Sequence, residues 1–239
     1  MLRSALASLC LVAGPATAQD LVTDRPDFTE SAVAVPLGSV QIETGGTLTV
    51  EGDANVFSGP EALVRWSFIP GLEVRLGAPD GVATRAGGET LDGFTDASLG
   101  LKAELATVGG WDLAAIVEAS VPLGDEAFGS TVVSPLAILI AGRDIGAVSL
   151  GTQAEARWNR EADTAEFAAT AVVGTEIVPG LGVFGELAGS LVDDEVGLLG
   201  HGGLTYLVAP LVQLDLHAGV GLTDAAPDAL LGVGASARF

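Results

Sequence analysis

Two histidines and one glutamate are the residues of this chain whose types and spacing best suit a metal ion. The chain has 2 histidines, His201 and His217, on the polar faces of two alternating segments that a turn at Ala209 would join. A hairpin centred there places the two imidazoles opposite each other, with Cβ atoms about 5 Å apart. Glu186, on the preceding segment, can join this row. Two imidazoles and a carboxylate can bind zinc, so the spacing predicts either a metal site or a hydrogen-bonded pair, which is the commoner arrangement.

Nucleophilic chemistry has less support in the sequence. The pattern Gly-x-Ser-x-Gly, which a serine hydrolase elbow requires, is absent from the chain. The chain has 1 cysteine, Cys10, and it falls in a predicted export signal, so neither disulfides nor thiol chemistry is expected after export. We therefore expect no enzyme and no cofactor.

Composition excludes further classes of protein. The 239 residues include 10 Lys and Arg against 31 Asp and Glu, and the net charge of −21 argues against a nucleic-acid partner. The mean hydropathy is +0.49, yet no uncharged apolar run of about 18 residues follows the N-terminal segment. A chain that is apolar on average and lacks a membrane helix is expected to be rich in β-strands.

Alternation of apolar and polar residues with a period of two recurs along the chain and predicts the elements that position these side chains. In residues 211–220, Leu214 and Leu216 share one face, while Asp215 and His217 share the other. Such runs predict an all-β fold with about twelve strands. The predicted strands span residues 39–50, 60–69, 71–78, 94–106, 110–121, 130–141, 144–156, 164–178, 181–192, 196–207, 210–221 and 229–239.

The connections between these strands alternate between tight turns and longer polar loops. Pro70-Gly71 and Gly109-Gly110 form tight turns, whereas 51–59 and 79–93 are predicted loops. Short periplasmic turns and longer outer loops are typical of an antiparallel outer-membrane β-barrel, here a single barrel over residues 39–239. A soluble sandwich is the alternative. Against it, Phe239 closes an alternating strand, as expected of a signal for the barrel assembly machinery, and we expect membrane lipid and lipopolysaccharide around the barrel.

The first 38 residues precede the predicted barrel. Residues 1–18 combine Arg3, an apolar stretch and Ala16-Thr17-Ala18, which predicts a cleaved signal peptide. Residues 19–38 contain no good strand, and we expect a periplasmic arm that folds into the mouth of the barrel, with a flexible lead-in as the alternative. The residues that mark this arm are Asp24, Arg25, Pro26, Asp27 and Phe28.

If the apolar face of each strand meets lipid, the polar face lines the lumen, and that face carries more carboxylates than cations. Rings of carboxylates favour cations, so the lumen is expected to pass cations or neutral polar solutes. A lumen plugged by ion pairs is the alternative. The predicted lumen-lining residues are Glu43, Arg65, Glu73, Arg75, Lys102, Glu104, Glu118, Glu155, Arg157, Glu176, Glu186, Asp215 and Arg238.

Three segments carry a resemblance to a known family. They are residues 23–31 (TDRPDFTES), 69–76 (IPGLEVRL) and 94–102 (FTDASLGLK). With them, residues 22–239 resemble a family of outer-membrane transporters named for the meta-cleavage pathway of phenol degradation. The resemblance implies a β-barrel in the outer membrane with a transport role, and it does not identify a solute for this chain.

Together these observations predict an outer-membrane channel or transporter for an unidentified small solute. One alternative is a plugged barrel with a structural or surface-interaction role and no transport. Another is an outer-membrane enzyme that modifies lipid, which would need a serine beside a histidine on the lipid face. Both histidines of this chain fall on the polar face instead.

Overall fold

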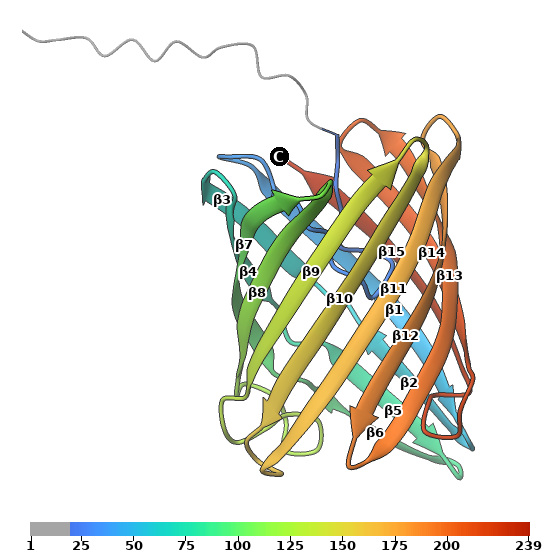
Figure 1. Cartoon of the computed structure of the whole chain (residues 1–239). Helices are drawn as coiled ribbons and strands as arrows, with labels where there is room; N and C mark the ends of the chain where they lie inside the picture. The colour runs from blue at the N-terminus through green and yellow to red at the C-terminus, as the bar shows by residue number, and fades with distance from the viewer. Residues whose placement is uncertain (1–19) are drawn as a thin grey trace, which may run out of the picture.

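The computed structural model describes residues 20–239. The predicted signal peptide, residues 1–18, lies outside these residues. In the described range no helix is long and apolar enough to cross a membrane. The strands wind around a common axis with a strong tilt, and both the start of the described chain and the C-terminus lie at the same end (Figure 1).

Twelve antiparallel strands form a closed ring, as the alternation predicts. Pairing of the first strand with the last closes it, from Gln41 opposite Arg238 to Val50 opposite Ala229. The ring strands are β1 (Val40–Glu51), β3 (Leu63–Ile69), β4 (Leu72–Gly77), β7 (Ala97–Val108), β8 (Trp111–Val121), β9 (Pro135–Ile145), β10 (Val148–Asn159), β11 (Thr164–Val178), β12 (Leu181–Val192), β13 (Glu195–Ala209), β14 (Val212–Gly221) and β15 (Ala229–Arg238).

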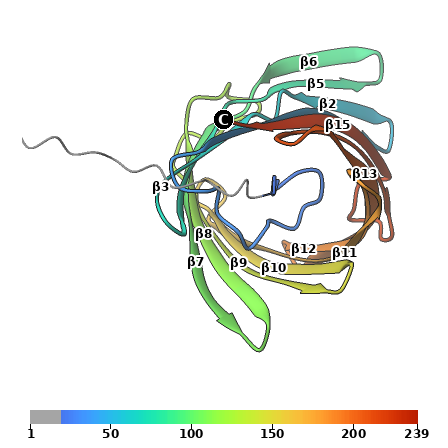
Figure 2. The ribbon, with the colours of Figure 1, turned by 90° about the horizontal axis from the view of Figure 1, so that it is seen from above.

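Three further strands lie where the sequence predicts only loops, so the prediction of loops at 51–59 and 79–93 is wrong. They are β2 (Ala54–Gly59), β5 (Gly81–Ala86) and β6 (Glu89–Phe94), and they appear beside the ring in Figure 2. Backbone hydrogen bonds from Ala78 to Ala62 (2.8 Å) and from Thr95 to Asp80 (2.9 Å) join them to β3, β4 and β7. Pro60 and Pro79 interrupt the alternation at these joints, because proline has no backbone donor for the sheet.

The barrel is apolar outside and polar inside. On β14, Leu214 and Leu216 are each 46% exposed, whereas Asp215 is 6% and His217 is 5% exposed. In a soluble protein the leucines would be buried and the charged residue exposed. An exposed apolar outer face with a polar interior is the arrangement of a barrel that spans a lipid bilayer.

Short turns connect the strands at one end of the barrel, and the C-terminal residue pairs with the start of the first strand there. Gly109 and Gly110 adopt positive φ angles of 61° and 82°, which lets β7 and β8 reverse in a tight turn. Phe239 donates its backbone N–H to Val40 (2.8 Å) and accepts one from it (3.1 Å). Its side chain is exposed beside the seam of the barrel, and its role as an assembly signal stays a prediction.

Candidate functional site

Residues 20–38, called the arm below, lie inside the ring of strands (Figure 2). At one end Arg238 donates from Nη1 to the carbonyl oxygen of Asp20 (3.0 Å). At the other end Gly38 donates its N–H to the carbonyl oxygen of Ser67 (2.7 Å), directly before β1 begins. The arm contains no helix or strand. Its backbone groups therefore depend on the side chains of the barrel wall.

Six backbone N–H groups of the arm donate to side chains on five strands. Asp24 donates to Glu43 on β1 (3.1 Å), and Val35 donates to Glu73 on β4 (2.9 Å). The others are Phe28 to Glu186 (3.0 Å), Thr29 to Glu186 (2.8 Å), Glu30 to Gln153 (2.8 Å) and Ala34 to Glu104 (2.9 Å). These contacts fix the main chain of the arm around the inner wall.

A buried cluster of charges lies where the arm meets β1, β3, β4 and β7. Asp24 is its centre, within 2.5 Å of Arg75, 2.9 Å of Lys102 and 3.2 Å of Arg65. The remaining ion pairs are Arg65 with Glu43 (2.7 Å), Arg65 with Glu73 (2.8 Å), Arg75 with Glu73 (3.1 Å) and Arg75 with Glu30 (2.8 Å). Removing one partner of such a buried network leaves uncompensated charge and is strongly destabilising.

The pKa values of two buried acidic residues of the arm, Asp24 and Glu30, are shifted in opposite directions. Burial alone would raise the pKa of Asp24, but the cations of Arg65, Lys102 and Arg75 outweigh it and hold that pKa well below its ordinary value. Burial raises the pKa of Glu30 to about 8, and the charge of Asp24 adds to this rise. The cluster has four carboxylates against three cations, so one shared proton would neutralise it.

Arg25 connects the arm to the adjoining part of the wall, around β14, β15 and β1. Its guanidinium lies 2.6 Å from Glu61, in the link between β2 and β3, and 3.3 Å from Asp215 on β14. Gly45 and Gly234 face each other across β1 and β15, and the guanidinium fills the space that their side chains would occupy. Arg25 is therefore held by two carboxylates of the barrel wall and by the close approach that the two glycines allow.

Glu186, His201 and His217 form a chain of hydrogen bonds next to the arm. Nδ1 of His201 lies 2.8 Å from Glu186, and its Nε2 lies 2.9 Å from Nδ1 of His217. The ring of Phe28 lies against that of His201, with centroids 4.6 Å apart. Since the carboxylate accepts the proton of His201 Nδ1, the neutral imidazole accepts at Nε2 from His217.

The predicted register of this pair needs correction. His201 lies opposite Gly219, and His217 lies opposite Gly203, because the pairing shifts between Leu207 and Ala209. The two rings therefore meet diagonally. Nδ1 of His201 faces Glu186 and its Nε2 faces Nδ1 of His217, so these nitrogens do not converge on a common point. Among the residues that the structure describes, no group of three or more His, Cys, Asp and Glu side chains is placed to hold a metal ion, so the zinc hypothesis for Glu186, His201 and His217 has no support here.

One part of the lumenal wall is apolar. Ile116 on β8 lies opposite Lys102, and Ile138 on β9 lies opposite Glu155, so both isoleucines share the lumenal face of those charged residues. They are buried together with Ala32 of the arm. This apolar ledge consists of Ala114, Ile116, Leu136, Ile138 and Ile140. The weak alternation of residues 130–141 is the sequence signal for it, because β9 is apolar on both faces.

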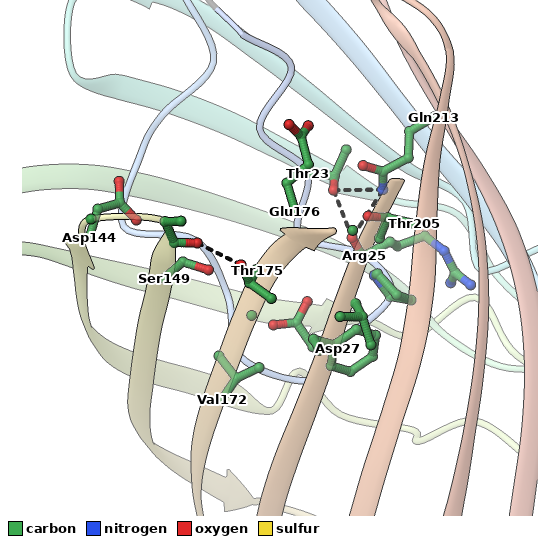
Figure 3. Close-up of a pocket in the computed structure, with 17 residues that line it drawn as sticks. Thr23, Arg25, Asp27, Asp144, Ser149, Val172, Thr175, Glu176, Thr205 and Gln213 are labelled. Carbon is green, nitrogen blue, oxygen red and sulfur yellow. Dashed lines mark hydrogen bonds between the residues drawn. The ribbon is translucent and has the colours of Figure 1, made fainter. Parts of the chain in front are cut away.

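Polar cavities lie beside the arm. One of about 320 Å³ opens between the arm and β9–β14 (Figure 3), and the side chains of Asp27, Asp144 and Glu176 line it. Burial and the charge of Glu186 raise the pKa of Asp27 to about 8. A second cavity, of about 530 Å³, lies between the arm and the wall and is lined by Ala32 of the arm and Glu104 of β7. The arm thus fills the middle of the lumen without filling all of it.

Of the other predicted lumenal residues, all but Arg238, which bonds to Asp20, lie away from the arm. Arg157 pairs with Glu155 (3.4 Å) and lines a third cavity of about 310 Å³ beside residues 128–134. Glu118 lies across from Gly100, and Arg238 lies at the end of β15. The predicted site residues omit several polar contacts of the arm, among them those of Thr29, Glu30, Gln41 and Gln153. Of these, Thr29 and Glu30 lie in the segment 23–31 that carries the family resemblance, which is the one signal that could have marked them.

The chain matches a known protein family over nearly its whole described length. The model of the family described as "Putative MetA-pathway of phenol degradation" matches residues 23–239. The chain belongs to this family. No curated protein matches it in sequence. A match to nearly the whole described range means that the arm and the barrel both belong to the family's pattern.

Solved structures share the fold. The COG4313 outer membrane channel from Pseudomonas putida F1 has a TM-score of 0.65 at 13% identity, covering 87% of this chain and 98% of that one. The KdgM porin has a TM-score of 0.59 at 10% identity, covering 83% and 99%. The NanC porin has a TM-score of 0.58 at 9% identity, covering 83% and 100%. The family member described here therefore has the fold of outer-membrane channels and porins.

Proposed function

We propose that this barrel is an outer-membrane channel for small solutes and that the arm closes its lumen at rest. The observation that carries the proposal is how the arm is held. Its main contacts are ion pairs and hydrogen bonds to wall side chains, which water can replace when the arm leaves. A segment packed only by apolar side chains would have no such replacement. Cavities on both sides of the arm provide space for solute.

The charge of the lumen favours cations or neutral polar solutes over anions. Carboxylates outnumber cations on the lumenal face, from Glu43 and Glu73 near one end to Glu155 and Glu166 near the other. Carboxylates along a pore lower the energy of a cation and raise that of an anion. We infer that the open state prefers cations for this reason.

Planar bilayer recordings test both parts. Deleting residues 20–36 should raise the conductance well above that of the full chain, and the reversal potential in a salt gradient should show cation preference. Equal conductance with and without the arm would contradict its role as a plug. Clear anion selectivity would contradict the charge assignment, and absence of current in both forms would favour a structural barrel.

Within residues 20–239, the placement of the two histidines does not favour the enzyme alternative. The two histidines are bonded to each other and to Glu186 inside the lumen. An enzyme acting on membrane lipid would instead present its nucleophile and base on the outer face.

A further inference from the structure

We propose that the lumen recognises short peptides with free termini, and that the arm occupies the place of such a peptide at rest. The proposal rests on the channel function proposed above and adds the chemical class of the solute. A short peptide carries one positive end, one negative end and several N–H donors between them. The wall satisfies each of these features in the arm.

The wall binds the arm through main-chain groups. Glu43, Glu73, Glu104, Gln153 and Glu186 accept the six backbone N–H groups described above, at 2.8 to 3.1 Å. Main-chain recognition depends little on sequence, so the same acceptors suit any peptide that follows this path. Sugars and simple inorganic cations lack such a row of amide donors.

The charges of the wall are separated into two poles. Arg65, Arg75 and Lys102 on β3, β4 and β7 outnumber their wall partners Glu43 and Glu73 by one charge, and they hold the carboxylates of the arm. On the adjoining part of the wall, Asp215 and Glu61 hold the guanidinium of Arg25. A solute that replaces the arm must place negative charge at the first pole and positive charge at the second, as a zwitterion does.

The apolar ledge adds a surface for small side chains. Ala32 packs on it, buried with Ile116 and Ile138. The neighbouring residues Val33, Ala34 and Val35 are also small and apolar. A peptide of small apolar residues would cover the ledge in the same way when the arm is displaced, which keeps apolar surface from water.

Binding can be measured without any current. Saturation-transfer difference NMR on the full chain in detergent micelles would compare trialanine with three relatives of similar size: its N-acetylated form, its C-terminal amide, and alanyl-lactyl-lactate, in which esters replace both amides while the free ammonium and carboxylate remain. We expect trialanine to bind about tenfold more tightly than each relative, a difference of about 1.4 kcal/mol. Equal binding of all four compounds would overturn the proposal.

Two full-length variants locate the site. Asp215→Asn removes one of the two carboxylates of the negative pole and should reduce the preference for trialanine over its N-acetylated form several-fold. Glu118→Gln makes the same change of charge in the wall at a residue that is not bonded to the arm, and it should keep the preference. A preference that is undiminished in Asp215→Asn would overturn the placement of the positive end.

Displacement of the arm provides a second readout. Trialanine should raise the rate at which a thiol reagent labels Ala34→Cys, since peptide and arm compete for one site and Ala34 is buried. Labelling that does not respond to peptide would overturn the competition. If the barrel conducts but shows no preference for trialanine, this inference is wrong and the proposed channel function is retained. If trialanine binds but no variant conducts, the channel function is wrong and the peptide site is retained.

Discussion

Oε1 of Glu186 accepts two hydrogen bonds from Thr29, one from its backbone N–H (2.8 Å) and one from its hydroxyl (2.6 Å). Thr29 belongs to the arm and Glu186 to the wall, so this pair joins two parts of the chain that are 157 residues apart. The same carboxylate also receives Nδ1–H of His201, which keeps it ionised and oriented. Glu186 is therefore a central acceptor for the docked arm.

Thr29→Val should loosen the arm without altering the barrel. The change removes a hydroxyl bonded to a carboxylate, which is worth about 1.5 kcal/mol, or roughly a tenfold rise in the population of the released arm. The rate of thiol labelling at Ala34→Cys reports this population. Thr175→Val serves as the matched control, because its hydroxyl donates to Ala147 within the wall. Equal labelling of the two variants would contradict a role of Thr29 in docking.

Asp24→Asn should release the arm more strongly. The substitution removes the negative charge that faces Arg65, Arg75 and Lys102, and breaking a buried ion-pair network costs about 3 kcal/mol. Labelling of Ala34→Cys should rise roughly a hundredfold, and single-channel open time should lengthen. Glu118→Gln, which is not bonded to the arm, should change neither quantity. Wild-type labelling in Asp24→Asn would show that the cluster does not hold the arm.

Alkaline pH should weaken docking of the arm. Burial raises the pKa values of Asp27 and Glu30 in the docked state to about 8, above their ordinary values of 3.8 and 4.5. The docked arm therefore holds protons that the released arm gives up between about pH 4 and pH 8. This contribution is complete below about pH 4 and is lost as pH rises through 8. Open probability at constant ionic strength should increase from pH 6 to pH 9.

The double variant Asp27→Asn and Glu30→Gln separates this effect from other titrations. Without the two carboxyl groups, the rise in open probability between pH 6 and pH 9 should be largely absent. A rise of unchanged size would assign the pH dependence to other groups.

The barrel itself could be predicted from local patterns. Each predicted strand requires only its own alternation, as in Leu214, Asp215 and Leu216, and a closed ring follows from repeating that pattern with short turns. The strands β2, β5 and β6 were missed because Pro60 and Pro79 break the alternation into runs too short to recognise. Their continuity with β3, β4 and β7 is visible only in the pairing across the joints.

The site could be predicted only in part. Alternation places Arg65, Arg75 and Lys102 on the lumenal face but does not reveal their shared partner, because Asp24 lies on a segment with no period. The contact between His201 and His217 was predicted, while its register was shifted by an irregularity near Ala209 that no residue pattern marks. Long-range pairing of an irregular segment depends on geometry that only the folded barrel supplies.

Strand β9 gives a strict test of which side faces lipid, because the sequence alone does not distinguish its two apolar faces. Leu139 is 64% exposed on the outside, whereas Ile138 is 5% exposed in the lumen and lies opposite Glu155. Leu139→Arg should lower the free energy of unfolding in lipid by about 2–4 kcal/mol, as a charge near the middle of the bilayer does. Glu118→Arg, on the lumenal face of the neighbouring strand β8 and away from the arm and the apolar ledge, should cost much less, because the new guanidinium lies in a polar part of the lumen. Urea unfolding of both variants in the same vesicles measures the difference, and equal losses would contradict the assigned faces.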